Sequence, residues 1–154
     1  MTSAELKTTR ESLGLTADWL AKKAGVQLRT VRYWESGRNA VPEDVAKIMT
    51  DLQTWRDSAV AAMVQSYEGA TPKPDEIVLL RYRDDAQLWT HHPGFEGLPV
   101  TFHASALLAA QKALQAIGCR VKIVYMNSEA YTHWLAVQGF EDSESARTQW
   151  AALQ

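Results

Sequence analysis

Polar and basic side chains gather in one short stretch of the sequence, between Gln27 and Asn39. Arginine can donate two hydrogen bonds to guanine, glutamine can pair with adenine, and threonine or leucine can contact the methyl group of thymine. Arginine and asparagine beyond a glycine suit the backbone phosphates, which fix the register of a protein on DNA. The stretch therefore predicts a surface that binds double-stranded DNA, made of Gln27, Leu28, Arg29, Thr30, Arg32, Tyr33, Arg38 and Asn39.

The local charge supports this prediction, although the chain as a whole is mildly acidic. The formal net charge of the 154 residues is -2 at pH 7. Between Lys22 and Arg38, however, five basic residues stand against Glu35 alone, which gives this stretch a charge of +4. Because a net charge averages over local fields, an acidic total does not exclude a nucleic-acid partner.

Two short helices are expected ahead of the basic stretch. Thr2 and Glu5 have the spacing of a capping box and predict a first helix over residues 3–13. Thr16 predicts the start of a second helix, and Gly25 its end, since glycine favours the left-handed conformation found there.

The basic stretch itself is predicted to be a third helix, over residues 27–36. Val31 and Trp34 fall on its inner side, the polar residues fall on its outer side, and Gly37 ends it. Two short helices joined by a glycine-containing turn, the second one basic, form the geometry that places a recognition helix in the major groove of DNA.

The same segment resembles a known family over about residues 3 to 68. It is similar to the helix-turn-helix proteins of the phage Cro and repressor type. The positions that carry the resemblance are Leu6, Arg10, Leu13, Gly14, Leu15, the helix from Thr16 to Ala21, Gly25, Val26, Val31 and the run from Trp34 to Arg38.

This resemblance has further implications. It implies that Arg10 and Glu35 form a partly buried structural ion pair. The run from Trp34 to Arg38 followed by Val41 and Pro42 is also similar to anti-CRISPR-associated repressors, which bind inverted repeats as homodimers and silence their own operons. The chain departs from the family at Ala17, where glutamine is common, and at Gln27, where serine or threonine is common, which puts contacts from the second helix in doubt.

After Pro42, apolar residues recur at three- and four-residue spacing as far as Tyr67. The pattern predicts one long amphipathic helix or two nearly continuous ones. A five-helix DNA-binding domain does not need so long an apolar stripe, so part of it is expected to form the seam of a homodimer. The expected dimer residues are Met49, Leu52, Trp55 and Met63.

Residues 69–75 contain Gly69, Pro72 and Pro74 and are the expected linker between two domains, residues 1–68 and 76–154. Residues 77–82 and 121–125 are rich in β-branched and aromatic side chains and predict strands. Helices are expected over residues 105–117, after Ser128 and over residues 143–153, and Asp84 with Asp85 is expected to cap a helix. The predicted fold is α+β and mostly α: a five-helix helix-turn-helix domain followed by a small α/β dimerisation or partner domain.

Other classes of function find little support in the sequence. Cys119 is the single cysteine, and no helical histidine pair with a carboxylate is present, so we expect no metal, no cofactor and packing or solvated histidines at His91, His92, His103 and His133. No nucleophile elbow or phosphate loop occurs, so no enzyme activity is expected, and Glu141 with Asp142 is interpreted as solvated loop charge. Without an apolar run of about 20 residues or a signal peptide, the chain is expected in the cytoplasm and not in a membrane.

Three hypotheses remain open. The first is a homodimeric repressor that regulates its own operon through an inverted repeat. The second is an antitoxin whose C-terminal domain binds a toxin. The third is a regulator whose C-terminal domain senses a small ligand, with Trp89, Tyr125 and Tyr131 lining a pocket. The operator sequence and the regulated genes cannot be read from any of these patterns.

Overall fold

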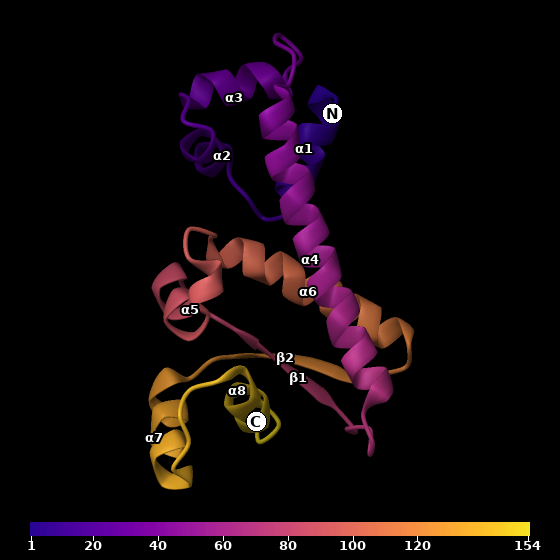
Figure 1. The fold of residues 1–154 in the computed structure, drawn as a ribbon, viewed down its shortest axis with the longest axis vertical. Helices are drawn as coiled ribbons and strands as arrows, with labels where there is room; N and C mark the ends of the chain where they lie inside the picture. Colours follow the sequence, from indigo (N-terminus) through magenta and orange to yellow (C-terminus); the bar gives the residue numbers. More distant parts are fainter.

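The computed structural model describes residues 1–154, and helices dominate it (Figure 1). A small two-stranded sheet lies in the C-terminal half, so the expected α+β, mostly helical fold is confirmed. The elements are α1 (Ser3–Ser12), α2 (Ala17–Lys23), α3 (Leu28–Glu35), α4 (Glu43–Gly69), β1 (Ile77–Arg81), α5 (Asp85–His91), the 3-10 turn η1 (Pro93–Phe95), α6 (Val100–Ala116), β2 (Val121–Tyr125), α7 (Ser128–Gln138) and α8 (Glu144–Ala151).

The N-terminal part contains four helices, and the expectation of five was wrong. Residues 43–69 contain no proline, and their glycine stands at the very end, so nothing interrupts α4. At about 1.5 Å per residue, its 27 residues extend about 40 Å, along much of the length of the molecule (Figure 1). None of the helices is long and apolar enough to cross a lipid bilayer.

The first three helices and the beginning of α4 form a unit that we call the head, residues 1–52. Its core contains Leu6, Leu20, Val31 and Met49, which are all fully buried. The Thr2 hydroxyl caps α1 and the Thr16 hydroxyl caps α2, as the sequence predicted. Gly25 has a φ of +66°, the left-handed conformation expected where α2 ends.

The remaining residues, 53–154, form a unit that we call the body. Its strands β1 and β2 pair in parallel, with Ile77 opposite Val121, and the chain crosses from one to the other through α6. Leu79 packs with Leu107 of α6 and Val60 of α4 on one face of the sheet. On the other face, Tyr82 and Met126 pack with residues of α7 and α8. The sheet is thus covered on both faces, as parallel strands require.

Two helices of the body begin at other residues than expected. Helix α6 starts at Val100, five residues before the predicted Ser105, because Pro99 precedes it in an extended conformation. Asn127 caps α7 in place of Ser128, since its side-chain oxygen accepts a hydrogen bond from the Ala130 N–H. Asp84 caps the short helix α5, as predicted.

The head and the body are joined by direct packing and hydrogen bonds. Phe102 of α6 is fully buried in the core of the head, and Trp55 of α4 stacks on it with 5.7 Å between ring centroids. The Thr101 hydroxyl donates a hydrogen bond to the Gly14 carbonyl, and the Trp19 indole donates one to a backbone carbonyl of the body. The division into residues 1–68 and 76–154 stays a prediction, since α4 packs against both units.

Histidines of the body pack together with aromatic rings below the head. The ring of Tyr82 lies 5.7 Å from His91, 5.4 Å from His92 and 5.2 Å from His103. Burial lowers the pKa of His92 to about 4, with a further contribution from the charge of Arg147. Burial likewise lowers the pKa of His103 to about 3, with smaller effects from His92 and Arg81. Both imidazoles are therefore neutral in the folded chain at pH 7.

Acidification is expected to destabilise the fold through these two histidines. Their ordinary pKa of 6.5 applies in the unfolded chain, so below pH 6.5 the unfolded state binds protons that the folded state does not. Stability is complete above pH 6.5 and is lost as the pH falls toward 4, by up to about 1.4 kcal/mol per pH unit for each histidine.

Urea unfolding at pH 7 and pH 5 measures this loss. The variant His103→Phe should reduce the pH dependence, and His133→Gln, on the exposed surface, should leave it unchanged. Equal stability of the parent chain at the two pH values would contradict the prediction.

Candidate nucleic-acid interface

Helix α3 presents a buried apolar face and an exposed polar face. Val31 is fully buried and Trp34 is 6% exposed, and both pack in the core of the head. Gln27, Arg29 and Arg32 are exposed, and Thr30 is half-buried. Because the inner residues fix the rotation of the helix, the outer residues stand on a rigid support.

The charged side chains on this surface have no partner of opposite charge. Arg29, Arg32 and Arg38 form no ion pair within the chain, whereas Lys22 on α2 pairs with Asp18 at 2.7 Å. Three guanidinium groups thus remain free to bind an anion or an acceptor on a base. Gln27 begins α3 without using its side chain as a cap, so its amide is free as well.

The turn after α3 continues the polar surface. The guanidinium of Arg38 lies 4.4 Å from the centre of the Tyr33 ring, in cation–π contact. The Asn39 N–H donates to the Tyr33 carbonyl over 3.2 Å, which closes the turn beside the helix. Leu28 is half-buried at the edge of the head core, so only part of its side chain can reach a ligand. All eight residues of the predicted surface therefore lie on α3, at Gln27 immediately before it, or in the turn that follows it.

The beginning of α4 is an unfavourable place for a phosphate. Its first turn carries Glu43 and Asp44, both exposed, and the Asp44 carboxylate accepts a hydrogen bond from the Val45 N–H. These negative charges oppose an anion at the helix N-terminus. Arg38 and Asn39 are the phosphate-binding candidates that remain near this point.

The ion pair between Arg10 and Glu35 is present and fastens α3 to α1. Arg10 Nε donates to one carboxylate oxygen of Glu35 over 2.5 Å and Nη2 donates to the other over 3.2 Å. Arg10 Nη1 also donates to the Leu15 carbonyl over 2.7 Å. The arginine is 7% exposed, so the pair lies inside the head and not on the polar surface.

The four expected dimer residues lie in different surroundings. Met49 is fully buried in the core of its own head, so its assignment to a dimer seam was wrong. The apolar residues in the first turns of α4 pack against the other helices of the same chain. Leu52 is half-buried against the same core. Trp55 is 42% exposed although it stacks on Phe102, and Met63 is 38% exposed. Trp55 and Met63 remain available to a second chain.

The three aromatic residues assigned to a ligand pocket have different surroundings. The Trp89 indole donates to the Leu98 carbonyl, Tyr131 is fully buried, and Tyr125 is exposed next to Arg83. None of the three lines either of the two main surface hollows. Trp89 and Tyr131 instead pack in the same apolar cluster as Tyr82, while Tyr125 is exposed beyond it.

Asp142 is an exposed residue of the loop before α8, as expected, but its carboxylate is also held by other side chains. Its carboxylate accepts hydrogen bonds from the Tyr131 hydroxyl over 2.7 Å and from Arg147 over 2.5 Å. Burial by itself would raise the pKa of Asp142, but these hydrogen bonds outweigh it and lower the pKa below 3.8. No local sequence signal marks the group, because its partners come from other helices.

Comparison with known proteins agrees with the geometry of the head. Residues 3–67 match a family model described as a helix-turn-helix domain. The Aca2 repressor of Pectobacterium phage ZF40 is 40% identical to the chain over 75 residues. That alignment covers 47% of this chain and 65% of the phage protein, so it spans slightly less than two thirds of the relative. The first match confirms the resemblance of these residues to helix-turn-helix domains, and the second shows that the chain is similar to a phage repressor.

Proposed function

Residues 3–67 form a helix-turn-helix domain, and from this premise we propose that the chain is a sequence-specific DNA-binding repressor. Its recognition helix is α3, which enters the major groove with Gln27, Arg29, Thr30 and Arg32 toward the bases. Arg38 and Asn39 bind the phosphate backbone at the side of the groove. The observation that carries the proposal is the set of unpaired arginines on the exposed face of a helix whose other face is buried.

The proposed repressor acts as a homodimer on an inverted repeat. Two recognition helices related by a twofold axis read half-sites about 34 Å apart, one turn of DNA. Trp55 and Met63 are exposed on α4, beyond the head and away from the reading surface, and serve as the proposed contacts between chains. Because the head is fixed to the body by Phe102 and Thr101, contacts along α4 would also fix the spacing of the two heads.

A titration with DNA from the region upstream of the chain's own gene tests the proposal. Fluorescence anisotropy should give specific affinity that resists scrambled competitor DNA and falls linearly in log salt, with two chains bound to each inverted repeat. Weak binding that does not depend on sequence would contradict the proposal.

The variants Arg29→Ala and Arg32→Ala should each weaken binding to the cognate site by about 1–3 kcal/mol, or roughly 5- to 150-fold. Each substitution removes a donor to a base without disturbing the buried face of α3. The matched control is Lys112→Ala, an exposed basic residue of α6 in the body, which should bind as the parent chain does. Unchanged affinity in both arginine variants would show that another surface reads the DNA.

An antitoxin is the second candidate function. The body exposes large apolar side chains near its C-terminal end, with Val137 66% exposed and Phe140 44% exposed. Both residues could be covered by a protein partner such as a toxin. Purification of a stable complex with the product of a neighbouring gene, together with weak DNA binding by the chain alone, would favour this candidate over the first.

A further inference from the structure

A serine, a histidine and an aspartate of the body lie next to one another, in that order. The Ser128 hydroxyl lies 3.1 Å from Nε2 of His91, and Nδ1 of the same ring lies 3.5 Å from the Asp142 carboxylate. The three residues come from α7, from α5 and from the loop before α8. Because Ser128 and His91 are 37 positions apart, no sequence motif marks the group.

The surroundings of His91 determine which nitrogen carries its proton. The side chain is 7% exposed, and Nδ1 has no hydrogen-bond partner, so the nearest acceptor for a proton there is Asp142. With the proton on Nδ1, the lone pair of Nε2 faces the Ser128 hydroxyl. Gln87 Nε2 donates to the same serine oxygen over 2.9 Å, which leaves the hydroxyl proton to point toward His91. This is the arrangement in which a histidine can act as a general base for a serine.

The aspartate is held in place and ionised. Tyr131 and Arg147 both donate to Oδ1 of Asp142, so its other oxygen, Oδ2, is the one that faces His91. A carboxylate fixed in this way orients the ring and stabilises the imidazolium that forms when the histidine takes up a proton.

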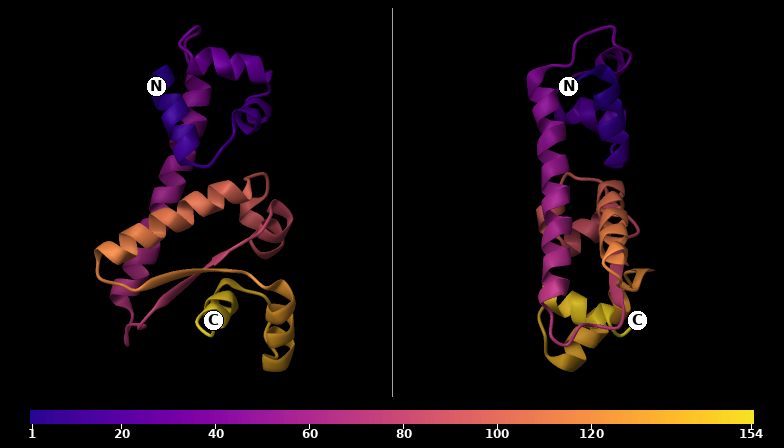
Figure 2. Two further views of the ribbon diagram at one scale, coloured as in Figure 1. Left: turned by 180° about the vertical axis from the view of Figure 1, so that it is seen from behind. Right: turned by 90° about the vertical axis from the view of Figure 1, so that its right-hand side faces the viewer.

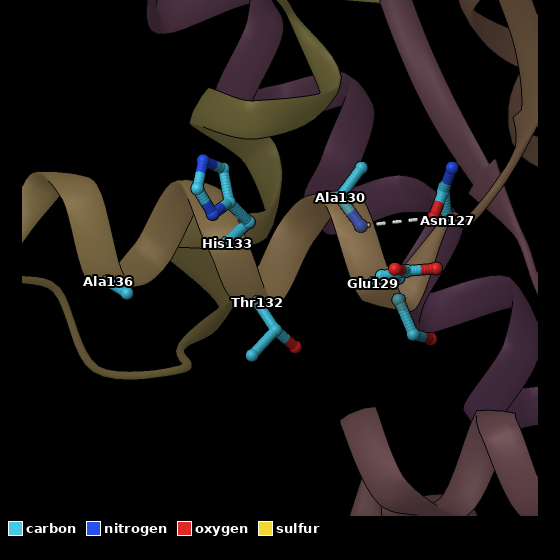
Figure 3. A pocket seen from close by; sticks show the side chains of 7 residues that line it. Asn127, Glu129, Ala130, Thr132, His133 and Ala136 are labelled. Atoms are coloured by element: carbon cyan, nitrogen blue, oxygen red, sulfur yellow. Dashed lines mark hydrogen bonds between the residues drawn. The ribbon is translucent and has the colours of Figure 1, made fainter.

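Ser128 also borders open space and free backbone donors. It is half-buried, and it lines a surface hollow of about 870 Å³ that follows the outer face of α7 past Thr132, His133 and Ala136 (Figure 3). The backbone N–H groups of Ser128 and Glu129 donate to no group of the protein, because the Asn127 side chain caps only Ala130. Two such groups beside a serine at the start of a helix can stabilise an oxyanion.

We propose that Ser128 is a reactive serine that accepts an acyl group from a small ester in this hollow. The serine oxygen forms a bond to the carbonyl carbon while His91 takes the hydroxyl proton. The bond from that carbon to the leaving alcohol then breaks, and the alcohol departs with the proton from His91. Water, activated by the same histidine, hydrolyses the acyl-serine and restores the hydroxyl. This reactivity is separate from the proposed binding of DNA by the head.

A fluorophosphonate probe applied to the full chain tests the proposal. The Ser128 oxygen displaces fluoride from phosphorus, so intact mass should rise by one probe group and peptide mapping should place the group on Ser128. Ser128→Ala should abolish the adduct, and His91→Gln should slow its formation by about 100-fold or more. The matched control is Ser145→Ala, an exposed serine in the first turn of α8 with no histidine bound to it, which should label like the parent chain.

Two results would overturn the proposal. One is the absence of any adduct on Ser128 in the folded parent chain, a readout that does not depend on the stability of a variant. The other is labelling of His91→Gln at the parent rate, whether or not its unfolding temperature falls, because the histidine would then play no part in activating the serine.

Discussion

Gly14→Ala is expected to lower the free energy of unfolding by about 3–4 kcal/mol. Gly14 has a φ of +67°, where an alanine costs about 1–2 kcal/mol in backbone strain. A methyl group at this position would in addition overlap the carbonyl of Thr101, a backbone atom that cannot rotate away. The junction between the head and the body would have to open, with loss of the hydrogen bond from Thr101 to Gly14.

Gly25→Ala is the matched control for this prediction. Gly25 has nearly the same φ, +66°, but no atom lies within 4 Å of the position that its methyl group would take. The free energy of unfolding of Gly25→Ala should therefore fall only by the cost of the backbone strain, about 1–2 kcal/mol. Urea unfolding followed by tryptophan fluorescence compares the two variants. Equal losses would mean that the head does not rest on α6 as the structure has it (Figure 2).

Glu35→Ala is expected to cost about 3–5 kcal/mol, because it leaves the buried charge of Arg10 with only the exposed Glu11 carboxylate, 3.4 Å away, as a partner of opposite charge. Arg10 donates two hydrogen bonds to the Glu35 carboxylate, and the Glu35 side chain is only 10% exposed. Water therefore cannot replace the carboxylate. Since the pair fastens α3 to α1, affinity for DNA should fall together with stability.

The control for the ion pair is Asp18→Ala, which removes the partner of Lys22 on the surface of α2. Both side chains of that pair are more than half exposed, so its loss should change stability by no more than about 1 kcal/mol. The double variant Arg10→Met with Glu35→Leu should recover part of the loss, because it removes both buried charges. If the single and the double variants were equally unstable, the uncompensated charge would not be the cause.

The sequence by itself determined the local features of the head. Thr2, Thr16 and Gly25 mark helix ends through contacts with residues three or four positions away, so their signals are complete within a short window. The inward positions of Val31 and Trp34 follow from helical periodicity alone. The exposed polar surface of α3 was predictable for the same reason, as the complement of its buried face.

The tertiary structure decided everything that depends on which elements meet. Periodicity placed Met49, Trp55 and Met63 on one stripe, but only packing separates Met49, buried in the head, from the two residues left exposed on α4. The burial of Phe102 in the head joins residues far apart in the chain. The sequence indicates only that Asp142 is a loop charge, whereas its hydrogen bonds with Tyr131 and Arg147 depend on how the helices pack. Such contacts leave no periodic trace, because a helix or strand has the same local pattern whichever partner covers its apolar face.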